Sequence, residues 1–207
     1  MNNFDLLAKE YDTERRIKRA KVFADELRLY ITDGYNKTAI EYGCGTGLVG
    51  FNLINDFRSV IFVDSSVQMI EQVNQKLLSI GNTSGSAICC DFITDTQNEL
   101  KADYIFTSLV LHHIEDTKAI LSRFYYILND KGRLLIIDKM GKNLGNGILL
   151  ASAQDPDEYD GFDQFALAEV TRELGFMNVE TKSLNYDNMD GNRFFIFSAI
   201  KKHCPDI

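Results

Sequence analysis

Short, continuous hydrophobic runs alternate along the chain with stretches in which hydrophobic residues recur every three or four positions. Continuous runs are typical of strands covered on both faces of a sheet, and the periodic stretches are typical of helices packed on one side. Strands are therefore predicted at about 37–43, 59–64, 86–92, 103–111 and 132–138. Helices are predicted at about 4–30, 48–57, 67–80, 118–130 and 164–174.

This alternation predicts a Rossmann-like, doubly wound α/β sheet with right-handed crossovers and helices on both faces. Two further strand-like runs, at 177–184 and 193–200, are joined by the turn-rich sequence NYDNMDGN. They predict an antiparallel hairpin at a sheet edge. Ligands of such sheets bind beyond the carboxyl ends of the parallel strands, so functional residues are expected there.

The bulk composition limits the class of protein. The chain has 207 residues, of which 45% are hydrophobic and 25% charged, as in an ordinary soluble globular domain. No apolar run approaches the ~20 residues of a membrane-spanning helix, so a cytoplasmic protein with no membrane partner is expected. The net charge of −8 argues against a nucleic-acid partner. The four cysteines lack zinc-like spacing, and no metal site is expected.

Residues 41–50 read EYGCGTGLVG and follow the first predicted strand. The last three glycines fit G-x-G-x-x-G, the dinucleotide fingerprint, but a pyrophosphate is disfavoured beside the carboxylate of Glu41. Read one glycine earlier, the frame places Gly43, Gly45 and Gly47 after that carboxylate. This frame suits a cofactor with a sulfonium and an ammonium group, a description that fits S-adenosylmethionine. Gly50 then serves helix packing.

Acidic residues also close the second and third predicted strands. Asp64 can accept hydrogen bonds from both hydroxyls of a ribose, although sheets that bind NAD and sheets that bind S-adenosylmethionine share this position. Asp91 is placed to accept from an adenine amino group, and Phe92 to cover a ring face. Capping of the following turn is an equally good interpretation of Asp91.

Taken in order, these segments resemble the class I S-adenosylmethionine-dependent methyltransferases, especially their small-molecule branch. The resemblance covers about residues 38–200 and is carried by EYGCGTG, FVDSS, CCDF, TSLVLHHIED and LNDKGRLLIID. FDLLAKEYD near the start resembles the family's N-terminal lid. The family fold implies a seven-stranded, mostly parallel sheet with an antiparallel last strand. Two departures are Tyr42, at a usually aliphatic site, and Lys131, in place of the proline of the late turn.

The resemblance also implies a set of cofactor ligands. The three glycines of the loop lie under the methionyl part, Asp64 binds the ribose and Asp91 binds the adenine. Tyr11 closes the pocket from the lid in this interpretation, although a place in the apolar stripe of its helix is nearly as consistent. The expected cofactor-binding residues are Tyr11, Glu41, Gly43, Cys44, Gly45, Gly47, Asp64, Ser65, Asp91, Phe92, Thr107 and Ser108.

Methyl transfer from a sulfonium is an in-line displacement, so the protein mainly aligns the acceptor and excludes water. A general base is needed only if the acceptor arrives protonated. His112 and His113 follow the fourth strand and are the candidates for catalytic residues. The alternative is that one of them packs and the other positions the loop. No Ser–His–Asp set is apparent in the sequence.

The connection at about 139–162 is rich in glycine and acidic residues. Its segment DPDEYDGFD, residues 155–163, fails as a calcium loop, because Tyr159 stands where a ligand is needed and Asp160 where glycine is needed. A substrate-side loop suited to a cationic or amine acceptor is one interpretation. A solvated loop is the other.

The sequence thus predicts one methyltransferase domain over 1–207, with an N-terminal helical lid at 1–36 and a cofactor-binding α/β core at 37–207. The predicted function is S-adenosylmethionine-dependent methyl transfer to a small-molecule acceptor. One alternative is a non-catalytic module that binds S-adenosylmethionine or S-adenosylhomocysteine. The other is an NAD-dependent oxidoreductase, for which no hydride-transfer partner is recognisable.

Overall fold

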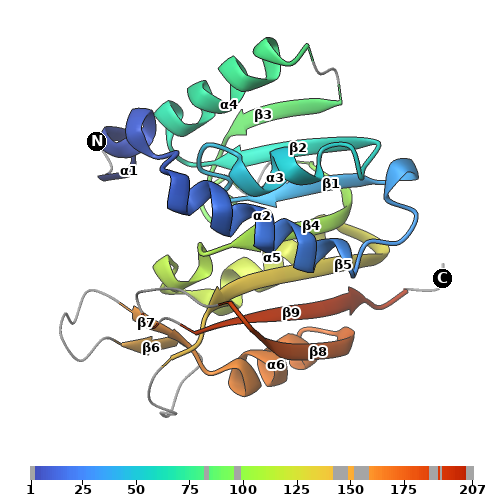
Figure 1. Ribbon diagram of the computed structural model, residues 1–207. Helices are drawn as coiled ribbons and strands as arrows, with labels where there is room; N and C mark the ends of the chain where they lie inside the picture. Colours follow the sequence, from blue (N-terminus) through green and yellow to red (C-terminus); the bar gives the residue numbers. More distant parts are fainter. Residues whose placement is uncertain are drawn as a thin grey trace. The chain divides into compact units, whose positions relative to one another are not determined.

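The computed structural model describes residues 3–81, 84–95, 99–141, 149–151, 159–186, 191 and 193–203. Seven strands are hydrogen-bonded in the order β3-β2-β1-β4-β5-β9-β8 (Figure 1). Strand β1 is parallel to β2 and β4, β2 is parallel to β3, and β9 is antiparallel to β5 and β8. This confirms the predicted sheet with an antiparallel last strand. The strands are β1 (Thr38–Tyr42), β2 (Ser59–Asp64), β3 (Gly85–Cys89), β4 (Ala102–Ser108), β5 (Leu128–Lys139), β8 (Phe176–Leu184) and β9 (Phe194–Lys201).

The chain divides into two compact units, which are described separately. The first comprises Met1–Asn98 with Tyr104–Phe106, and the second comprises Glu99–Asp103 with Thr107–Ile207. The assignment of the whole chain to one domain stays a prediction. Within the described residues, no helix is both long enough and apolar enough to cross a membrane.

The helices of the first unit begin where side chains cap them. The single N-terminal helix predicted at 4–30 is wrong, because Thr13 Oγ1 accepts the N–H of Arg16 and starts a new helix there. Ser66 caps α4 in the same way, and Gly81, with a φ of 60°, follows its end as predicted. The helices are α1 (Asn3–Leu7), η1 (Ala8–Glu10), α2 (Glu14–Arg28), η2 (Gly34–Asn36), α3 (Leu48–Leu53) and α4 (Val67–Ser79).

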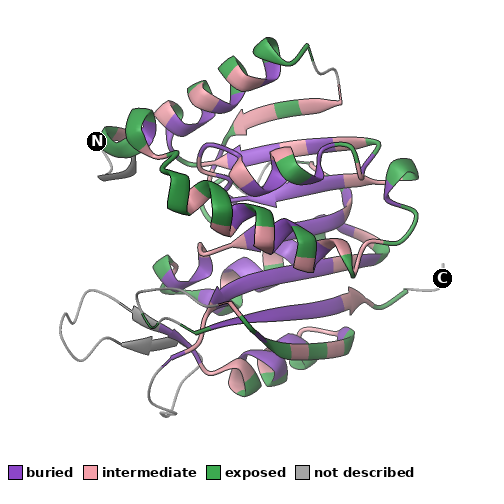
Figure 2. Cartoon of the chain, viewed as in Figure 1, coloured by how far each residue is buried: buried purple, intermediate pink, exposed green. Residues whose placement is uncertain are grey.

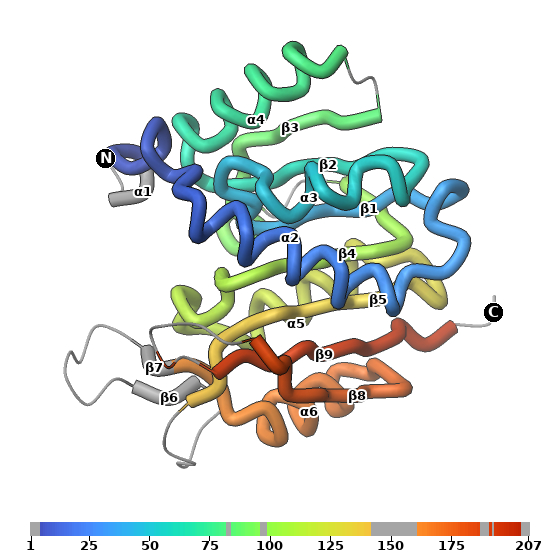
Figure 3. The backbone as a smooth tube through the Cα atoms, in the orientation of Figure 1, coloured from blue at the N-terminus to red at the C-terminus, as the bar shows by residue number. Residues whose placement is uncertain are grey.

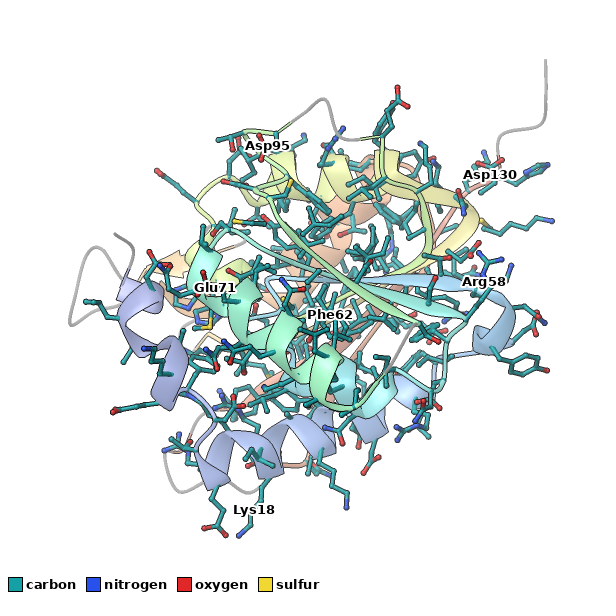
Figure 4. All side chains as sticks on the ribbon, turned by 90° about the horizontal axis from the view of Figure 1, so that it is seen from above. Lys18, Arg58, Phe62, Glu71, Asp95 and Asp130 are labelled. Atoms are coloured by element: carbon teal, nitrogen blue, oxygen red, sulfur yellow. The ribbon has the colours of Figure 1, made fainter. Side chains whose placement is uncertain are left out.

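The core of the first unit lies between these helices and β1, β2 and β3. Every residue of β1 after Thr38 is buried, and Figure 2 shows β1 and β2 as mostly buried strands. Helix α2 lies beside α3 (Figure 3) and buries a stripe that includes Phe23 and Leu27. Phe62 of β2 is fully buried, and Figure 4 shows it in the interior, whereas Lys18 projects outward from α2. The continuous strand pattern of the sequence reflects this two-sided cover.

The second unit contains the remaining helices and a small separate sheet. Strand β6 (Leu149–Ala151) pairs with β7 (Tyr159–Phe162), within the connection that was expected to be a loop. The predicted acidic segment 155–163 lies partly outside the described residues. Asp163, at its end, caps α6 (Gln164–Glu173) by accepting the N–H groups of Phe165 and Ala166. The other helices are η3 (Leu111–His113) and α5 (Thr117–Ile127).

Two predicted boundaries in this unit are wrong for backbone reasons. Strand β4 ends at Ser108 rather than at residue 111, because the chain turns at Leu109, whose φ is 57°. Helix α5 ends at Ile127 rather than at residue 130, because Leu128 is already extended and buried at the start of β5. Lys131 has a φ of 62°, which the proline ring forbids. Lys131 therefore occupies a position that favours glycine, and its assignment to the proline position is wrong.

The hairpin of β8 and β9 ends the sheet on one side, as predicted. Its register shifts between Met177 and Glu180, where Asn178 has a φ of 51°. This irregularity is a β-bulge, which twists the edge strand away from a flat geometry. The solvent-facing positions of β8 include the charged residue Lys182.

Candidate functional site

The glycine loop between β1 and α3 has a backbone that other residues rarely adopt. Gly43, Gly45 and Gly47 have φ values of 65°, 53° and 79°. The N–H of Cys44 donates to the Val63 carbonyl over 3.0 Å, which ties the loop to the end of β2. Burial raises the pKa of the Cys44 thiol well above its usual range, so this cysteine is a packing residue of the loop rather than a nucleophile.

Asp64, at the end of β2, faces this loop. Its Oδ2 accepts the N–H of Gly45 at 2.8 Å, and its Oδ1 accepts the N–H of Ser66 at 2.9 Å. Burial raises the pKa of the Asp64 carboxyl, against the effect of these backbone hydrogen bonds. A carboxylate has about four acceptor positions, so each oxygen retains capacity for a further donor. The position suits the paired hydroxyls of a ribose, and Ser65 beside it is exposed.

Glu41 lies beneath the loop, where only 2% of the residue is exposed. Its Oε2 accepts the N–H of Gly50 over 3.1 Å, and burial raises the pKa of the carboxyl to about 8. A Cβ at Gly50 would lie 2.3 Å from this oxygen and 2.5 Å from the Phe62 ring. The packing role predicted for Gly50 is therefore confirmed. A direct contact of Glu41 with the cofactor stays a prediction.

The end of β3 holds Asp91 and Phe92 in different roles. Asp91 Oδ1 accepts the N–H of Ile93 at 2.9 Å, so the capping interpretation of this residue is confirmed. Phe92 is fully buried and stacks on Tyr42 with ring centroids 4.9 Å apart. Its ring presents no exposed face, and its role against adenine stays a prediction. Burial and the charge of Asp91 raise the pKa of the Tyr42 hydroxyl.

Tyr11 is placed at the glycine loop rather than in a helical stripe, because it lies between η1 and α2. A Cβ built on Gly45 would be 3.6 Å from the Tyr11 ring, and the guanidinium of Arg16 lies 4.1 Å from the ring centroid. The following residue, Asp12, contacts the side chain of Thr46 in the loop. The structure therefore brings the predicted lid residue to the predicted cofactor loop.

The residues after β4 belong to the second unit. Thr107 is fully buried, and its Oγ1 has no hydrogen-bond partner among the described residues, while Ser108 is partly exposed. Leu109 then takes a left-handed conformation that is uncommon for a branched side chain and costs about 1–3 kcal/mol. Such strain is frequent at functional sites, and here it directs the chain into η3, which carries both candidate histidines.

His112 has a carboxylate partner that the sequence did not reveal. Its Nδ1 lies 2.6 Å from Asp138 Oδ1, at the end of β5, and both residues are buried. Asp138 also accepts the backbone N–H groups of Leu111, His112 and Lys139. This network fixes η3 and the orientation of the His112 ring. The sequence indicated no Ser–His–Asp set, and although His112 and Asp138 are paired, no serine completes a triad within these contacts.

His113 is exposed and stacks against His112, with ring centroids 4.0 Å apart. Partial burial, His112 and the charge of Lys139 lower the pKa of His113 to about 4. The ring is consequently neutral near pH 7, which is the state that a proton acceptor requires. Across the described residues, no three His, Cys, Asp or Glu side chains form a group that could hold a metal ion.

Sequence reasoning missed several residues that the structure brings to these places. Asp138 could have been found from the sequence, because it ends a predicted hydrophobic strand as Asp64 does. Thr46 lies within the quoted glycine motif and Asp12 at the end of the lid motif FDLLAKEYD, but Lys76 comes from a helical stretch with no distinguishing pattern. Only the folded chain brings them together.

Comparisons with known proteins agree with this geometry. The sequence model of a family described as "Methyltransferase domain" matches residues 40–134. The malonyl-[acyl-carrier protein] O-methyltransferase 2 of Ilyobacter polytropus is 30% identical over 144 residues, which cover 68% of this chain and 53% of that protein. The chain spans about half the length of the curated relatives it matches.

Solved structures share the fold. A phosphoethanolamine N-methyltransferase 2 of Haemonchus contortus, in complex with S-adenosyl-L-methionine, has a TM-score of 0.72 at 17% identity and covers 98% of this chain and 61% of that one. An S-adenosylmethionine-dependent methyltransferase of Aquifex aeolicus has a TM-score of 0.72 at 14% identity. The match covers 95% of this chain and 97% of that one. With the strand order, the glycine loop and the matched family region, this chain belongs to the class I S-adenosylmethionine-dependent methyltransferases.

Proposed function

We propose that the protein transfers the methyl group of S-adenosylmethionine to a small-molecule acceptor. The observation that supports this most directly is the bond between the glycine loop and the carboxylate that ends β2, Gly45 N–H to Asp64 Oδ2. The arrangement offers a glycine-lined surface beside a partly buried carboxylate with unused acceptor positions. It suits a nucleoside whose ribose hydroxyls donate to Asp64, and a solved structure with this fold is a complex with S-adenosyl-L-methionine.

We assign the cofactor contacts residue by residue. Asp64 accepts from the ribose hydroxyls, and the backbone of Gly43, Gly45 and Gly47 lies against the methionyl part. Asp91 accepts a hydrogen bond from the adenine amino group through Oδ2, since its Oδ1 accepts the N–H of Ile93. Glu41 acts through the loop, because its carboxyl holds the first turn of α3 by way of Gly50. The cofactor supplies an already activated methyl group.

We assign the acceptor side to the η3 turn. His113 is the base candidate, because its ring is exposed and neutral. His112 is a positioning residue, because its Nδ1 is bonded to Asp138 and its ring supports that of His113. The names of similar proteins, a malonyl-[acyl-carrier protein] O-methyltransferase and a phosphoethanolamine N-methyltransferase, suggest carboxylate and amine acceptors as the first compounds to test.

Calorimetry with S-adenosylhomocysteine and with NAD tests the cofactor assignment. We expect the wild-type chain to bind S-adenosylhomocysteine and to give no heat with NAD. Asp64→Ala removes one or two charge-assisted hydrogen bonds, worth roughly 1.5–3 kcal/mol each, so the dissociation constant rises by about tenfold or more. Transfer of labelled methyl from S-adenosylmethionine to amine and carboxylate compounds then tests the acceptor class.

Glu71→Gln is the matched control, because it removes an exposed carboxylate from α4 (Figure 4). It is expected to leave the affinity unchanged. Binding of NAD in place of S-adenosylhomocysteine would contradict the proposal. Equal affinity in Asp64→Ala and wild type would remove Asp64 from the site.

A further inference from the structure

Three residues from separate segments of the first unit form a closed ring of polar contacts. Thr46 Oγ1 donates to Asp12 Oδ1, and the Lys76 ammonium lies 2.6 Å from Asp12 Oδ2. The same ammonium donates to the Thr46 carbonyl oxygen over 2.7 Å. Asp12, Thr46 and Lys76 are called the Asp12 clamp below. The clamp joins the N-terminal segment, the glycine loop and α4.

Thr46 is the loop residue that the clamp restrains. It is 1% exposed and lies between Gly45 and Gly47, both of which have positive φ values. Glycine loses more conformational freedom on ordering than any other residue, so a loop with this sequence is costly to hold in one shape. The clamp engages both oxygen atoms of Thr46, one on the side chain and one on the backbone. It therefore fixes the peptide between the two flexible glycines.

The clamp also holds the N-terminal segment against the loop. Tyr11, whose ring faces Gly45, directly precedes Asp12 in the chain. A second contact, from Asp5 Oδ1 to Ser66 Oγ at 2.6 Å, ties the beginning of this segment to the start of α4. Asp5 is close enough to Asp64 that its charge raises the pKa of that carboxyl. Residues 5–12 thus lie beside the proposed ribose ligand and the loop.

The ion pair is partly shielded from solvent, unlike an ordinary surface pair. The side chains of Lys76 and Asp12 are 30% and 33% exposed, whereas Lys18 and Glu14 on α2 form a pair that is 71% and 82% exposed. The Lys76 ammonium also lies 5.6 Å from the centroid of the Phe51 ring. Shielded pairs that are hydrogen-bonded to further groups are less weakened by solvent than exposed ones, which are worth little.

We propose that Asp12 and Lys76 are positioning residues for the cofactor, because they hold the glycine loop in its binding shape and keep Tyr11 over it. The inference rests on the proposed binding of S-adenosylmethionine by this loop. Preorganisation removes ordering costs from the binding step, so the clamp raises cofactor affinity without contacting the cofactor. By retaining residues 5–12 over the loop, it also slows cofactor release.

Affinity and release rate for S-adenosylhomocysteine test this role in four variants. We expect Lys76→Met to weaken binding about tenfold and to speed dissociation, because it removes the charge-assisted bonds to Asp12 and Thr46. Thr46→Val, which removes only the hydroxyl, acts in the same direction, and Thr46→Ser, which keeps the hydroxyl, restores most of the wild-type affinity. Lys18→Met, at the exposed pair, is the matched control and leaves both values unchanged.

A measurement without ligand separates the clamp from the cofactor assignment. In ligand-free protein, backbone amides of residues 5–13 are expected to exchange hydrogen faster in Lys76→Met than in wild type, while amides of β1 and β2 keep their protection. If wild type fails to bind S-adenosylhomocysteine, the proposed function is rejected, and the exchange result still decides whether the clamp holds the segment. The inference is overturned if Lys76→Met and Thr46→Val both have the same cofactor affinity, release rate and hydrogen exchange as the wild type.

Discussion

At the scale of single residues, Glu41 is a buried titratable group in the proposed cofactor region. Its carboxyl is buried, and its one described hydrogen bond comes from the Gly50 N–H. Burial, reinforced by the charge of Asp64 and opposed by that of Lys76, raises the pKa from 4.5 to about 8. The folded protein consequently keeps a proton that the unfolded chain loses between these pH values.

The free energy of unfolding is therefore expected to fall as pH rises from about 4.5 to 8, by at most ~1.4 kcal/mol per pH unit from this group. Below this window Glu41 is protonated in both the folded and the unfolded chain, and above it in neither. Outside the window Glu41 therefore does not change the free energy of unfolding with pH. Glu41→Gln removes the titration, and the stability of the variant relative to wild type rises between pH 5 and pH 8. Urea denaturation at each pH measures the difference. For the exposed control Glu71→Gln, the difference in free energy of unfolding from wild type is expected to be constant with pH. A constant difference for Glu41→Gln as well would show that Glu41 does not hold its proton.

Residues whose role follows from their own backbone were predictable, and residues whose role depends on distant partners were not. The three glycines of the loop predicted positive φ values directly, and the glycine at position 50 predicted close packing. Glu41 was recognised as significant, but the sequence indicated a carboxylate beside the cofactor rather than one beneath the loop. Its burial depends on how α3 lies over β1. The stacking of Phe92 on Tyr42 was not predictable for the same reason, since only the fold brings the two rings together.

At the scale of elements, the η3 turn after β4 combines backbone strain with a buried network. Leu109 is left-handed, and Asp138 then accepts N–H groups from Leu111, from His112 and from the His112 ring. This places the two histidines in unlike states. His112 belongs to the buried hydrogen-bond network, whereas His113 is exposed and stacks on the His112 ring.

Substitutions in this turn are expected to separate stability from catalysis. Asp138→Ala leaves buried N–H donors without an acceptor and lowers the free energy of unfolding by about 3–5 kcal/mol. His113→Ala keeps near-wild-type stability and affinity for S-adenosylhomocysteine, but lowers the turnover number with a protonated acceptor. Urea denaturation, calorimetry and methyl-transfer assays supply the three values. If His113→Ala turns over such an acceptor at the wild-type rate, the base assignment is wrong.

Elements with a strong local pattern were predicted closely. The run SVIFVD gave the bounds of β2 as observed, because continuous β-branched residues leave little choice of structure. Boundaries failed where the local backbone conformation decides, as at Leu109, which is left-handed, and at Leu128, which is extended. The short strands β6 and β7 were missed, since strands of this length carry too few residues for a period to show.

At the scale of the whole molecule, the chain divides into two compact units, and the proposed cofactor contacts fall mostly in the first. Ligand binding stabilises the parts of a protein that it holds in their bound conformation. We expect S-adenosylhomocysteine to slow hydrogen exchange at residues 43–47, 64–66 and 91–93 of the first unit. Strands β8 and β9 of the second unit serve as the internal comparison and are expected to change little. Protection confined to those strands would place the cofactor elsewhere.

The parallel α/β sheet was predictable at this scale, because the alternation of strands and helices leaves few topologies open, and the antiparallel last strand followed from the terminal hairpin and the family resemblance. The division into two units was not, since no linker composition marks it in the sequence.

The bulge in β8 bears on how the protein behaves at high concentration. An edge strand offers unpaired backbone groups to any other chain with an extended segment, which is a common route to aggregation. In β8 the register shift near Asn178 interrupts the row of such groups, and charged side chains, including Lys182, alternate along the exposed side. A second copy could not add to this edge without burying a charge or matching the irregularity. The bulge thus protects the open edge of the sheet against self-assembly.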